Sequence, residues 1–304
     1  MGLFGFGKRK AGEEPVSARE RARLEKLVCD DLRRRGYAAQ VVGGRVRLRR
    51  GDSQAELGLD NLALMLADVP PPRWAAVVAA HLDNCFAGDA AHDDLDARRG
   101  DFDAVKDQLV LQLWPLTQAA QAGDRVVSRM LLDDLPAVLV FDTPSNIVAL
   151  NRDWLAPWGK SEDELFTLAA QQVRAVSQPK ETRTAIGEGL EIVVLLEDPY
   201  AATWVLHPDE HPGLVGPHGV LMAIPARDML VAHPVTDQRA VGALQVLVKL
   251  ALDAYQGSAY NLSHNVYWYH EGRHHTIHVQ PQNDGIAVSD ADPLFEHLMA
   301  LEEE

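Results

Sequence analysis

Cysteine and long hydrophobic runs are both scarce in this chain. Its 304 residues include two cysteines, Cys29 and Cys85, and such low use is typical of a reducing compartment rather than of a disulfide-stapled scaffold. Charged or amide residues interrupt every apolar stretch before it reaches the roughly 20 residues that a membrane-spanning helix needs. We therefore expect a cytoplasmic protein with reduced thiols and no transmembrane segment.

The first ten residues lack the order of a secretory signal, because their apolar residues come before the basic ones. Phe6 also occupies the place where an N-myristoylation signal has serine or threonine. We expect residues 1–16 to be a flexible N-terminus. The alternative is a weak peripheral membrane contact, in which Leu3, Phe4 and Phe6 enter the bilayer interface and the basic run 8–10 meets lipid headgroups.

Basic residues are fewer than acidic ones: the chain has 29 Lys+Arg and 44 Asp+Glu, which gives a net charge of -15 at pH 7. This balance argues against a nucleic-acid-binding protein, because a polyanion would be repelled. The charge is uneven, however, since residues 1–50 hold 14 of the basic residues and 6 of the acidic ones. A basic N-terminal part therefore precedes an acidic remainder, and we expect the basic part to meet an acidic protein partner.

The N-terminal part predicts a helix followed by a three-stranded antiparallel meander. Ser17 and Glu20 form a capping-box pattern, after which apolar residues recur at helical spacing until Gly36. Two-residue turns at Gly43-Gly44 and Gly51-Asp52 then separate three segments of alternating character, at 37–42, 45–50 and 53–59. A second helix is predicted over 74–86, covering the sheet.

The register of the meander follows from its turns. Closing them pairs Val41 with Val46, Ala39 with Leu48, Leu48 with Ala55 and Val46 with Leu57, so that the apolar partners share one face. The opposite face displays three arginines about 7 Å apart along one strand, which are Arg45, Arg47 and Arg49. We predict that these three bind phosphates or carboxylates of a partner. The alternative is a solvated face that is partly neutralised by Glu56, which lies across from Arg47, or that docks on the acidic remainder of the same chain.

The whole chain predicts an α+β fold with two domains. A small α-β-β-β-α domain (17–88) is followed by an acidic linker (89–104), a larger mixed α+β domain (105–281) and an acidic C-terminal tail (282–304). The predicted elements of the larger part include a helix over 102–113, a long helix over 237–257, and strands at 135–142, 190–196, 219–225 and 228–233. A hairpin is expected to turn at Glu271-Gly272.

Three stretches of the chain resemble a known family. They are VVSRMLLDDLPAVLVFD (126–142), NRDWLAPWGKSEDELFTLAAQQVR (151–174) and IPARDMLVAHPV (224–235). Together they are similar to the uncharacterised bacterial YtpQ-like family, domain of unknown function 1444, over roughly residues 20–280. The resemblance implies a bacterial cytosolic α+β protein and carries over no catalytic residue.

Aspartates near predicted strand ends form a candidate ligand or carboxylate cluster. Its members are Asp133, Asp134 and Asp142, with Arg227 and Asp228 next. Carboxylates of this kind can act as general acids or bases, although aspartate also occupies turns for purely conformational reasons.

We expect the chain to hold no metal and no cofactor. The alternative is a metal site formed by three histidines. His207, His211 and His218 are ligand types that suit zinc. Pro208 and Pro212 flank a segment too short for a stable helix, however, and this favours a solvated loop.

No motif identifies a reaction, so whether the chain is an enzyme stays open. We predict a non-catalytic binding or adaptor protein whose basic N-terminal domain engages an acidic partner. One alternative is a metal-dependent hydrolase that uses the histidine loop, and another is a peripheral membrane-associated protein.

Overall fold

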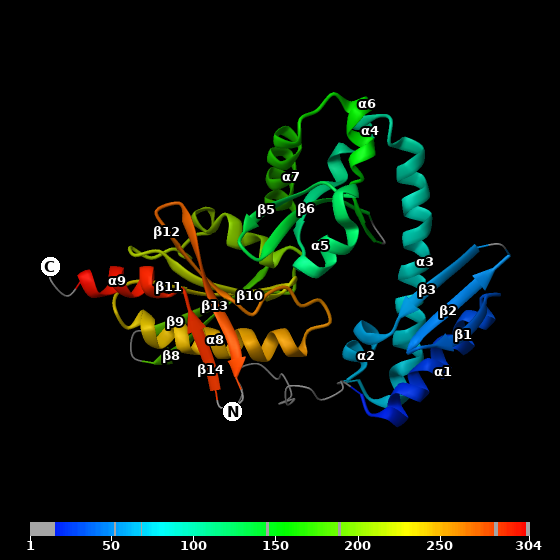
Figure 1. The fold of residues 1–304 in the computed structure, drawn as a ribbon, viewed down its shortest axis with the longest axis horizontal. Coiled ribbons are helices and arrows are strands. Elements are labelled where there is room, and N and C mark those ends of the chain that lie inside the picture. Colours follow the sequence, from blue (N-terminus) through cyan, green and yellow to red (C-terminus); the bar gives the residue numbers. More distant parts are fainter. Residues whose placement is uncertain are drawn as a thin grey trace. The chain divides into compact units, whose positions relative to one another are not determined.

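The computed structural model describes residues 16–301 except 52, 68, 144–145, 188–189 and 283–284, and leaves the side chains of 53 and 88–93 aside. Of the predicted flexible N-terminus 1–16, only Val16 belongs to this part of the chain, and it is buried in the core of the first unit rather than flexible. The predicted membrane-contacting residues lie outside the described residues. The chain divides into two compact units (Figure 1): residues 16–96 belong to the first, and most of 97–301 to the second. The fold is α+β, as predicted.

The first unit consists of three helices, a short 3-10 turn and one small sheet. In chain order its elements are α1 (Ala18–Arg34), β1 (Ala38–Val42), β2 (Arg45–Arg50), β3 (Ser53–Gly58), α2 (Asp60–Leu66), η1 (Pro71–Arg73) and α3 (Trp74–Arg98). The predicted capping box begins α1, because the Glu20 carboxylate accepts from the Ser17 backbone N–H at 2.9 Å. The helix α2 was not predicted from the sequence.

The predicted register of the meander is confirmed. Val41 pairs with Val46 and Ala39 with Leu48 across the first turn, while Leu48 pairs with Ala55 and Val46 with Leu57 across the second. Gly43 and Gly44 both have positive φ, 58° and 77°, which is what a type I′ hairpin turn requires of its central residues. The turn chemistry thus fixes which residues face the helices.

One face of this sheet closes over the core of the first unit. Val46 is fully buried and belongs to a cluster formed by α1, α2 and α3. Its largest members are Leu24, Leu32, Leu59, Leu62, Leu66, Trp74 and Leu82. Burying each such side chain contributes about 1.5–3 kcal/mol, and this contribution holds the inner face of the sheet against the helices.

The second unit contains two antiparallel sheets. The smaller has the order β4-β6-β5, with β7 paired to β6, and it is built from β4 (Leu109–Leu113), β5 (Ser128–Leu132), β6 (Leu135–Asp142) and β7 (Ile147–Ala149). Helix α7 (Glu162–Val176) packs on β4 and begins with a capping box formed by Ser161 and Glu164. Short helices complete this part: α4 (Phe102–Val105), η2 (Lys106–Gln108), α5 (Leu116–Ala122), η3 (Gly123–Arg125), η4 (Arg152–Trp154) and α6 (Leu155–Trp158).

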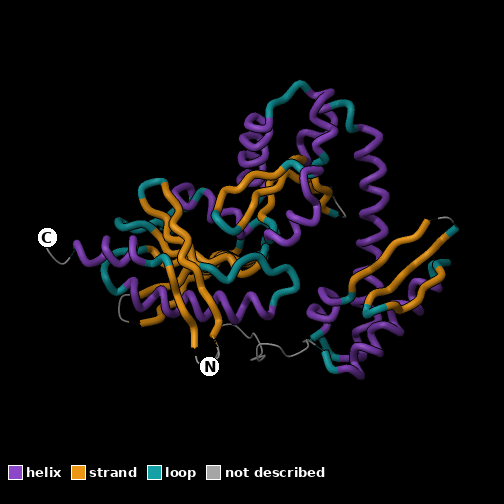
Figure 2. Tube along the Cα trace, in the orientation of Figure 1, coloured by secondary structure: helices purple, strands orange, loops and turns teal. Residues whose placement is uncertain are grey.

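The larger sheet has seven strands in the order β14-β13-β12-β10-β11-β9-β8. Figure 2 draws the strands of the molecule in orange. These strands are β8 (Lys180–Gly187), β9 (Leu190–Leu196), β10 (Val220–Ala226), β11 (Met229–Pro234), β12 (Val266–His270), β13 (Arg273–Gln282) and β14 (Gly285–Ser289). Helix α8 (Ala240–Gly257) runs along one face, and η5 (Ala201–Leu206), which η6 (Pro208–Glu210) follows, packs against β10 and β11. Both central strands are therefore almost fully buried.

Three predicted segments differ from the structure. The predicted acidic linker 89–104 is largely helical, because α3 continues to Arg98 and α4 begins at Phe102; alanines at 87, 90 and 91 favour helix over loop. The boundary between the units does fall inside this segment, at 96–97. The predicted acidic tail 282–304 is also wrong, since it contains β14, which pairs with β13, and α9 (Asp292–Ala300), which buries Leu294 and Leu298.

The helix predicted over 102–113 is wrong in its second half, where the chain forms β4. All five residues of β4 are buried, and a short apolar run of this length does not distinguish a buried strand from a buried helix.

Candidate functional site

The arginines predicted from the alternation of β2 lie together on the outer face of the first sheet. Arg45, Arg47 and Arg49 are all exposed, while Val46 between the first two is buried. The register places neighbours from the two other strands on the same face: Ala38, Gln40 and Val42 from β1, and Gln54, Glu56 and Gly58 from β3. We call these nine residues the arginine face.

One carboxylate partly neutralises the arginine face, and this is the feature that the alternative to partner binding named. The Nε and Nη2 atoms of Arg47 donate to Glu56 at 3.1 and 2.9 Å, and Arg45 lies 3.9 Å from the same carboxylate. Arg49 has no ion-pair partner among the described residues. Three positive charges thus face one negative charge, and an exposed pair of this kind contributes only about 0–1 kcal/mol. The face keeps a positive charge that an incoming carboxylate can meet.

The predicted carboxylate cluster is divided between two places, and Asp134 has a structural role. Its carboxylate accepts hydrogen bonds of 2.7 Å from Ser263 Oγ, Asn265 Nδ2 and Tyr267 OH. The turn between β5 and β6 is thereby tied to β12 of the larger sheet. Burial and the Asp134 charge raise the pKa of Tyr267 well above its ordinary value. Asp133, the neighbouring residue, is exposed.

Asp142 and Arg227 lie in the surroundings of Tyr200, which is buried at the start of η5. Burial, followed by the nearby Asp142 carboxylate, raises the pKa of Tyr200. Burial lowers the pKa of Arg227, whose guanidinium stands 5.3 Å from the ring centre of Tyr260. Its Nε atom is buried and has no hydrogen-bond partner in the described part of the chain. Asp228 is exposed.

The three histidines of the alternative metal site face different neighbours. His211 Nε2 lies 3.7 Å from Glu181, and its ring meets Trp204 edge-on. His218 Nδ1 lies 3.3 Å from His297 Nε2, and burial lowers the pKa of His207. Within residues 16–301 as described, no group of three or more histidine, cysteine or acidic side chains is arranged to hold a metal ion.

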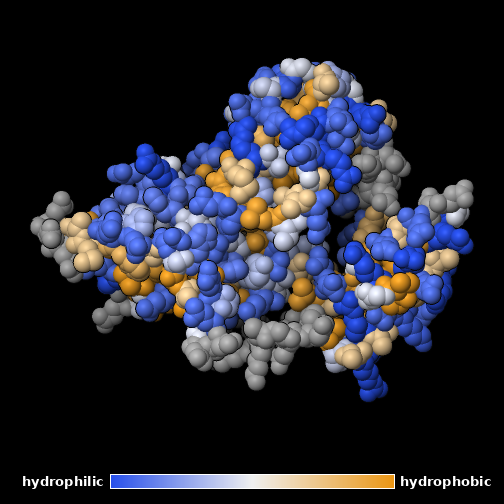
Figure 3. All heavy atoms as spheres, in the orientation of Figure 1, coloured by the Kyte–Doolittle hydropathy of each residue, from blue (hydrophilic) through white to orange (hydrophobic). Residues whose placement is uncertain are grey.

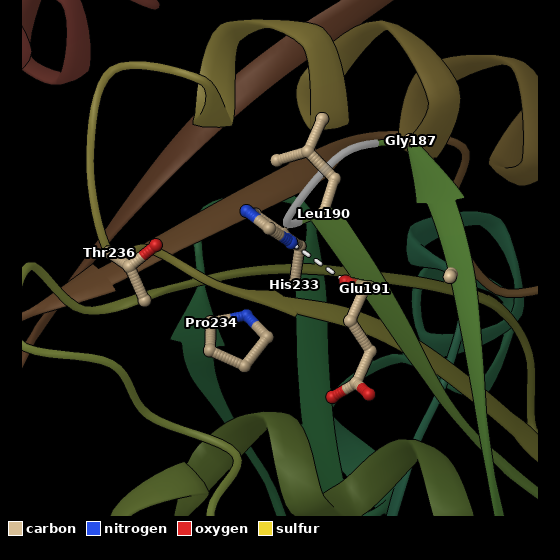
Figure 4. A pocket seen from close by; sticks show the side chains of 7 residues that line it. Gly187, Leu190, Glu191, His233, Pro234 and Thr236 are labelled. Atoms are coloured by element: carbon tan, nitrogen blue, oxygen red, sulfur yellow. Dashed lines mark hydrogen bonds between the residues drawn. The ribbon is translucent and has the colours of Figure 1, made fainter.

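Sequence reasoning missed a pocket at the edge of the larger sheet, shown in Figure 4. This open pocket has a volume of about 450 Å³, within the range of small-molecule sites. Its lining comes from β8, β9 and the end of β11 with the loop that follows, and consists of Ala185, Gly187, Leu190, Glu191, His233, Pro234 and Thr236. The order β11-β9-β8 brings these residues together from segments about 50 residues apart, and no local motif marks them.

Hydrophobic residues exposed elsewhere are scattered. On the face drawn in Figure 3 they form small separate areas among hydrophilic side chains. Scattered residues of this kind are normal on a protein surface. On this face, the described residues form no large apolar patch.

The chain matches no family model, no curated protein and no solved structure at a significant level. None of the described helices combines the length and the apolar character needed to cross a bilayer.

Proposed function

We propose that this chain is a non-catalytic binding protein, an adaptor, whose first unit presents the arginine face to an acidic surface of a protein partner. The observation that carries the proposal is the separation of the two faces of one small sheet. Val46 is buried in the core, whereas Arg45, Arg47 and Arg49 are exposed on the opposite side. Placing three guanidinium groups in one row gives a surface suited to carboxylates, because each can bind one in a bidentate manner.

The overall charge favours an acidic protein over a nucleic acid as the partner. A net charge of -15 repels an extended polyanion at long range. A compact acidic patch on a protein can instead meet the arginine face locally, within the roughly 8–10 Å over which charges act at physiological salt. Glu56 would then serve to reject partners that bring too little negative charge, since they could not displace it from Arg47.

The proposal also covers location and family. Two cysteines outside any disulfide, Cys29 and Cys85, suit the reducing cytoplasm of a bacterial cell. Membership of the YtpQ-like family remains part of the proposal, resting on the three sequence stretches that resemble it.

Affinity purification of the full chain from its host cells tests this function. The variant R45E/R47E/R49E reverses the charge of the arginine face without touching the core. We expect it to lose the acidic partners that the wild-type chain retains. The matched control R19E/K26E/R73E makes the same charge change at exposed positions of the same unit, and it should retain them.

Two results would reject the adaptor proposal. One is a set of bound proteins that is the same for the wild-type chain and for R45E/R47E/R49E. The other is an equal loss in the control, which would show that only the net charge of the unit matters.

A further inference from the structure

Strand β14 is the outermost strand at one end of the larger sheet (Figure 1), and no described strand pairs with its outer side. Its five residues, Gly285–Ser289, include no charged side chain. The strand at the other end, β8, carries Lys180, Glu181 and Arg183, and charges of this kind protect an edge strand from pairing with another chain. The central strands of this sheet are covered on both faces, but the edge at β14 lacks that protection.

The backbone of β14 directs two residues outward. Asn265, which precedes β12, accepts the Val279 N–H at 2.9 Å through its Oδ1 atom. The N–H and C=O of Val279 therefore point away from β14, and its pair with Val288 is one without mutual hydrogen bonds. Val288, and by the same alternation Ile286, turn their N–H and C=O away from β13. A further strand can bond to these two residues without displacing any bond between β14 and β13.

The same two residues carry exposed apolar side chains. Ile286 is 44% exposed and Val288 is 41% exposed. They share a face with their partners Pro281 and Val279, and Val279 belongs to the core beneath α8. The apolar surface thus continues from the core to the edge strand. A bound strand with apolar residues opposite Ile286 and Val288 would cover it.

Charge selects the kind of strand that fits. Residues 278–282 and 285–292 include no Lys or Arg, and Asp290 and Asp292 come directly after β14. Both aspartates are exposed. Asp290 lies 3.9 Å from the His278 ring, and neither aspartate has a Lys or Arg partner among the described residues. A basic strand is therefore attracted to this edge, whereas a second copy of β14 brings no basic residue to it.

We propose that β14 binds an extended segment of a protein partner as an additional antiparallel strand. The segment has apolar side chains opposite Ile286 and Val288 and Lys or Arg at its ends. Main-chain hydrogen bonds give such a complex its affinity, and alternate side chains give it specificity. Antiparallel pairing continues the direction of every strand pair in this sheet. The edge lies in the second unit and does not depend on the arginine face, which takes a partner of the opposite charge.

Binding of synthetic peptides to the full chain tests this inference. The probe is the capped peptide KKTVTVTKK, whose two valines can lie opposite Ile286 and Val288. In that pairing the valine N–H groups bond to β14 and the threonine N–H groups point outward. Methylation of both valine nitrogens should therefore weaken binding about tenfold or more. Methylation of two threonine nitrogens is the matched control, and it should leave the affinity nearly unchanged.

The charge of the peptide is tested separately. The peptide EETVTVTEE keeps the apolar residues and reverses the ends, and it should bind more weakly than the probe. The difference should shrink as the salt concentration rises, because salt screens exposed charges.

Hydrogen exchange in the wild-type chain locates the bound peptide. Addition of the probe should slow the exchange of the Ile286 and Val288 amides. The Ala287 amide faces β13 by the same alternation and should change little.

Two variants and a control test the edge itself. Val288→Lys brings a like charge to the basic probe and should weaken its binding about tenfold or more. Val288→Pro removes an outward N–H without removing a bond to β13, and it should do the same. Thr182→Lys makes the same charge change at an exposed position of the other edge strand, and it should bind the probe like the wild type.

The inference is overturned if the probe does not bind the wild-type chain, or if the valine-methylated or charge-reversed peptide binds as tightly as the probe. Analytical ultracentrifugation supplies one more rejecting result: a wild-type dimer that Val288→Lys dissociates would make a second copy the occupant of this edge. Should either Val288 variant fail to fold, the methylated peptides and the wild-type hydrogen exchange still decide.

Discussion

The small sheet of the first unit is covered on one face, whereas the central strands of the larger sheet are covered on both. In β2, the buried Val46 and the half-buried Leu48 alternate with exposed arginines. In β10 every residue is buried: Leu221 and Ala223 belong to the core beneath α8, while η5 packs against the same strand. A sheet covered on both faces has no surface left for a partner, whereas a sheet covered on one face can offer the other. This difference is the reason for assigning recognition to the first unit.

The largest effect should come from placing a charge on the wrong face of β2. Val46→Arg puts a guanidinium into the apolar core of the first unit. Burying this charge without a carboxylate partner should lower the unfolding free energy by about 3–5 kcal/mol. Gln40→Arg adds the same group on the outer face and should change stability by less than about 0.5 kcal/mol. Hydrogen exchange of the β1–β3 amides measures both; equal protection in the two variants would refute the assignment of the faces.

A smaller but clear effect is expected at Asp134, where the second unit uses a carboxylate for structure. Asp134→Ala leaves Ser263, Asn265 and the buried Tyr267 hydroxyl without their acceptor and should cost about 2–3 kcal/mol. Asp133→Ala, at the adjacent exposed position, should be nearly neutral. Urea denaturation of the second unit distinguishes them, and a neutral Asp134→Ala would show that the network carries no stability.

A pH effect of modest size is expected from His297 of the second unit. Burial, and then the neighbouring His270 and His218, lower the pKa of His297. The unfolded chain therefore binds the proton more readily, so stability is fully present above the ordinary histidine pKa of about 6.5 and is lost as the pH falls below it toward the folded pKa. The urea midpoint should decrease between pH 7 and pH 5, and less so in His297→Gln. Parallel curves for the two proteins would contradict this assignment.

The smallest change in stability should accompany a gain in binding at the arginine face. Glu56→Gln removes the carboxylate bound to Arg47 and should alter the unfolding free energy by less than about 1 kcal/mol. Affinity for an acidic partner should rise, and its dependence on salt should steepen. Weaker binding by Glu56→Gln would mean that this carboxylate helps to orient the arginines rather than competing for them.

Local chemistry explains which parts of the molecule could be predicted from the sequence. The meander was predictable because Gly43-Gly44 closes a turn of known geometry, after which strict alternation sets the face of every residue. The capping box at the start of α1 was recognisable for the same reason, since two residues three positions apart, Ser17 and Glu20, decide it.

Tertiary packing explains the rest. Asp134 reaches Tyr267 across 133 positions of the chain, and His233 shares its pocket with Ala185 only because β9 lies between their strands. The predictions of a linker at 89–104 and a tail at 282–304 were wrong for another reason. Charged residues indicate exposure to solvent, but an alanine-rich helix or an edge strand can carry charged residues on its solvent side.

Site-specific photo-crosslinking in cells tests the central claim most directly. A photoreactive amino acid at Gln40 or Gln54 lies on the arginine face, whereas one at the exposed Gln171 of α7 lies on the second unit. The account predicts that the first two positions capture a shared acidic protein, that Gln171 does not, and that the capture disappears in R45E/R47E/R49E. Crosslinks that persist in that variant, or that arise equally from Gln171, would contradict it.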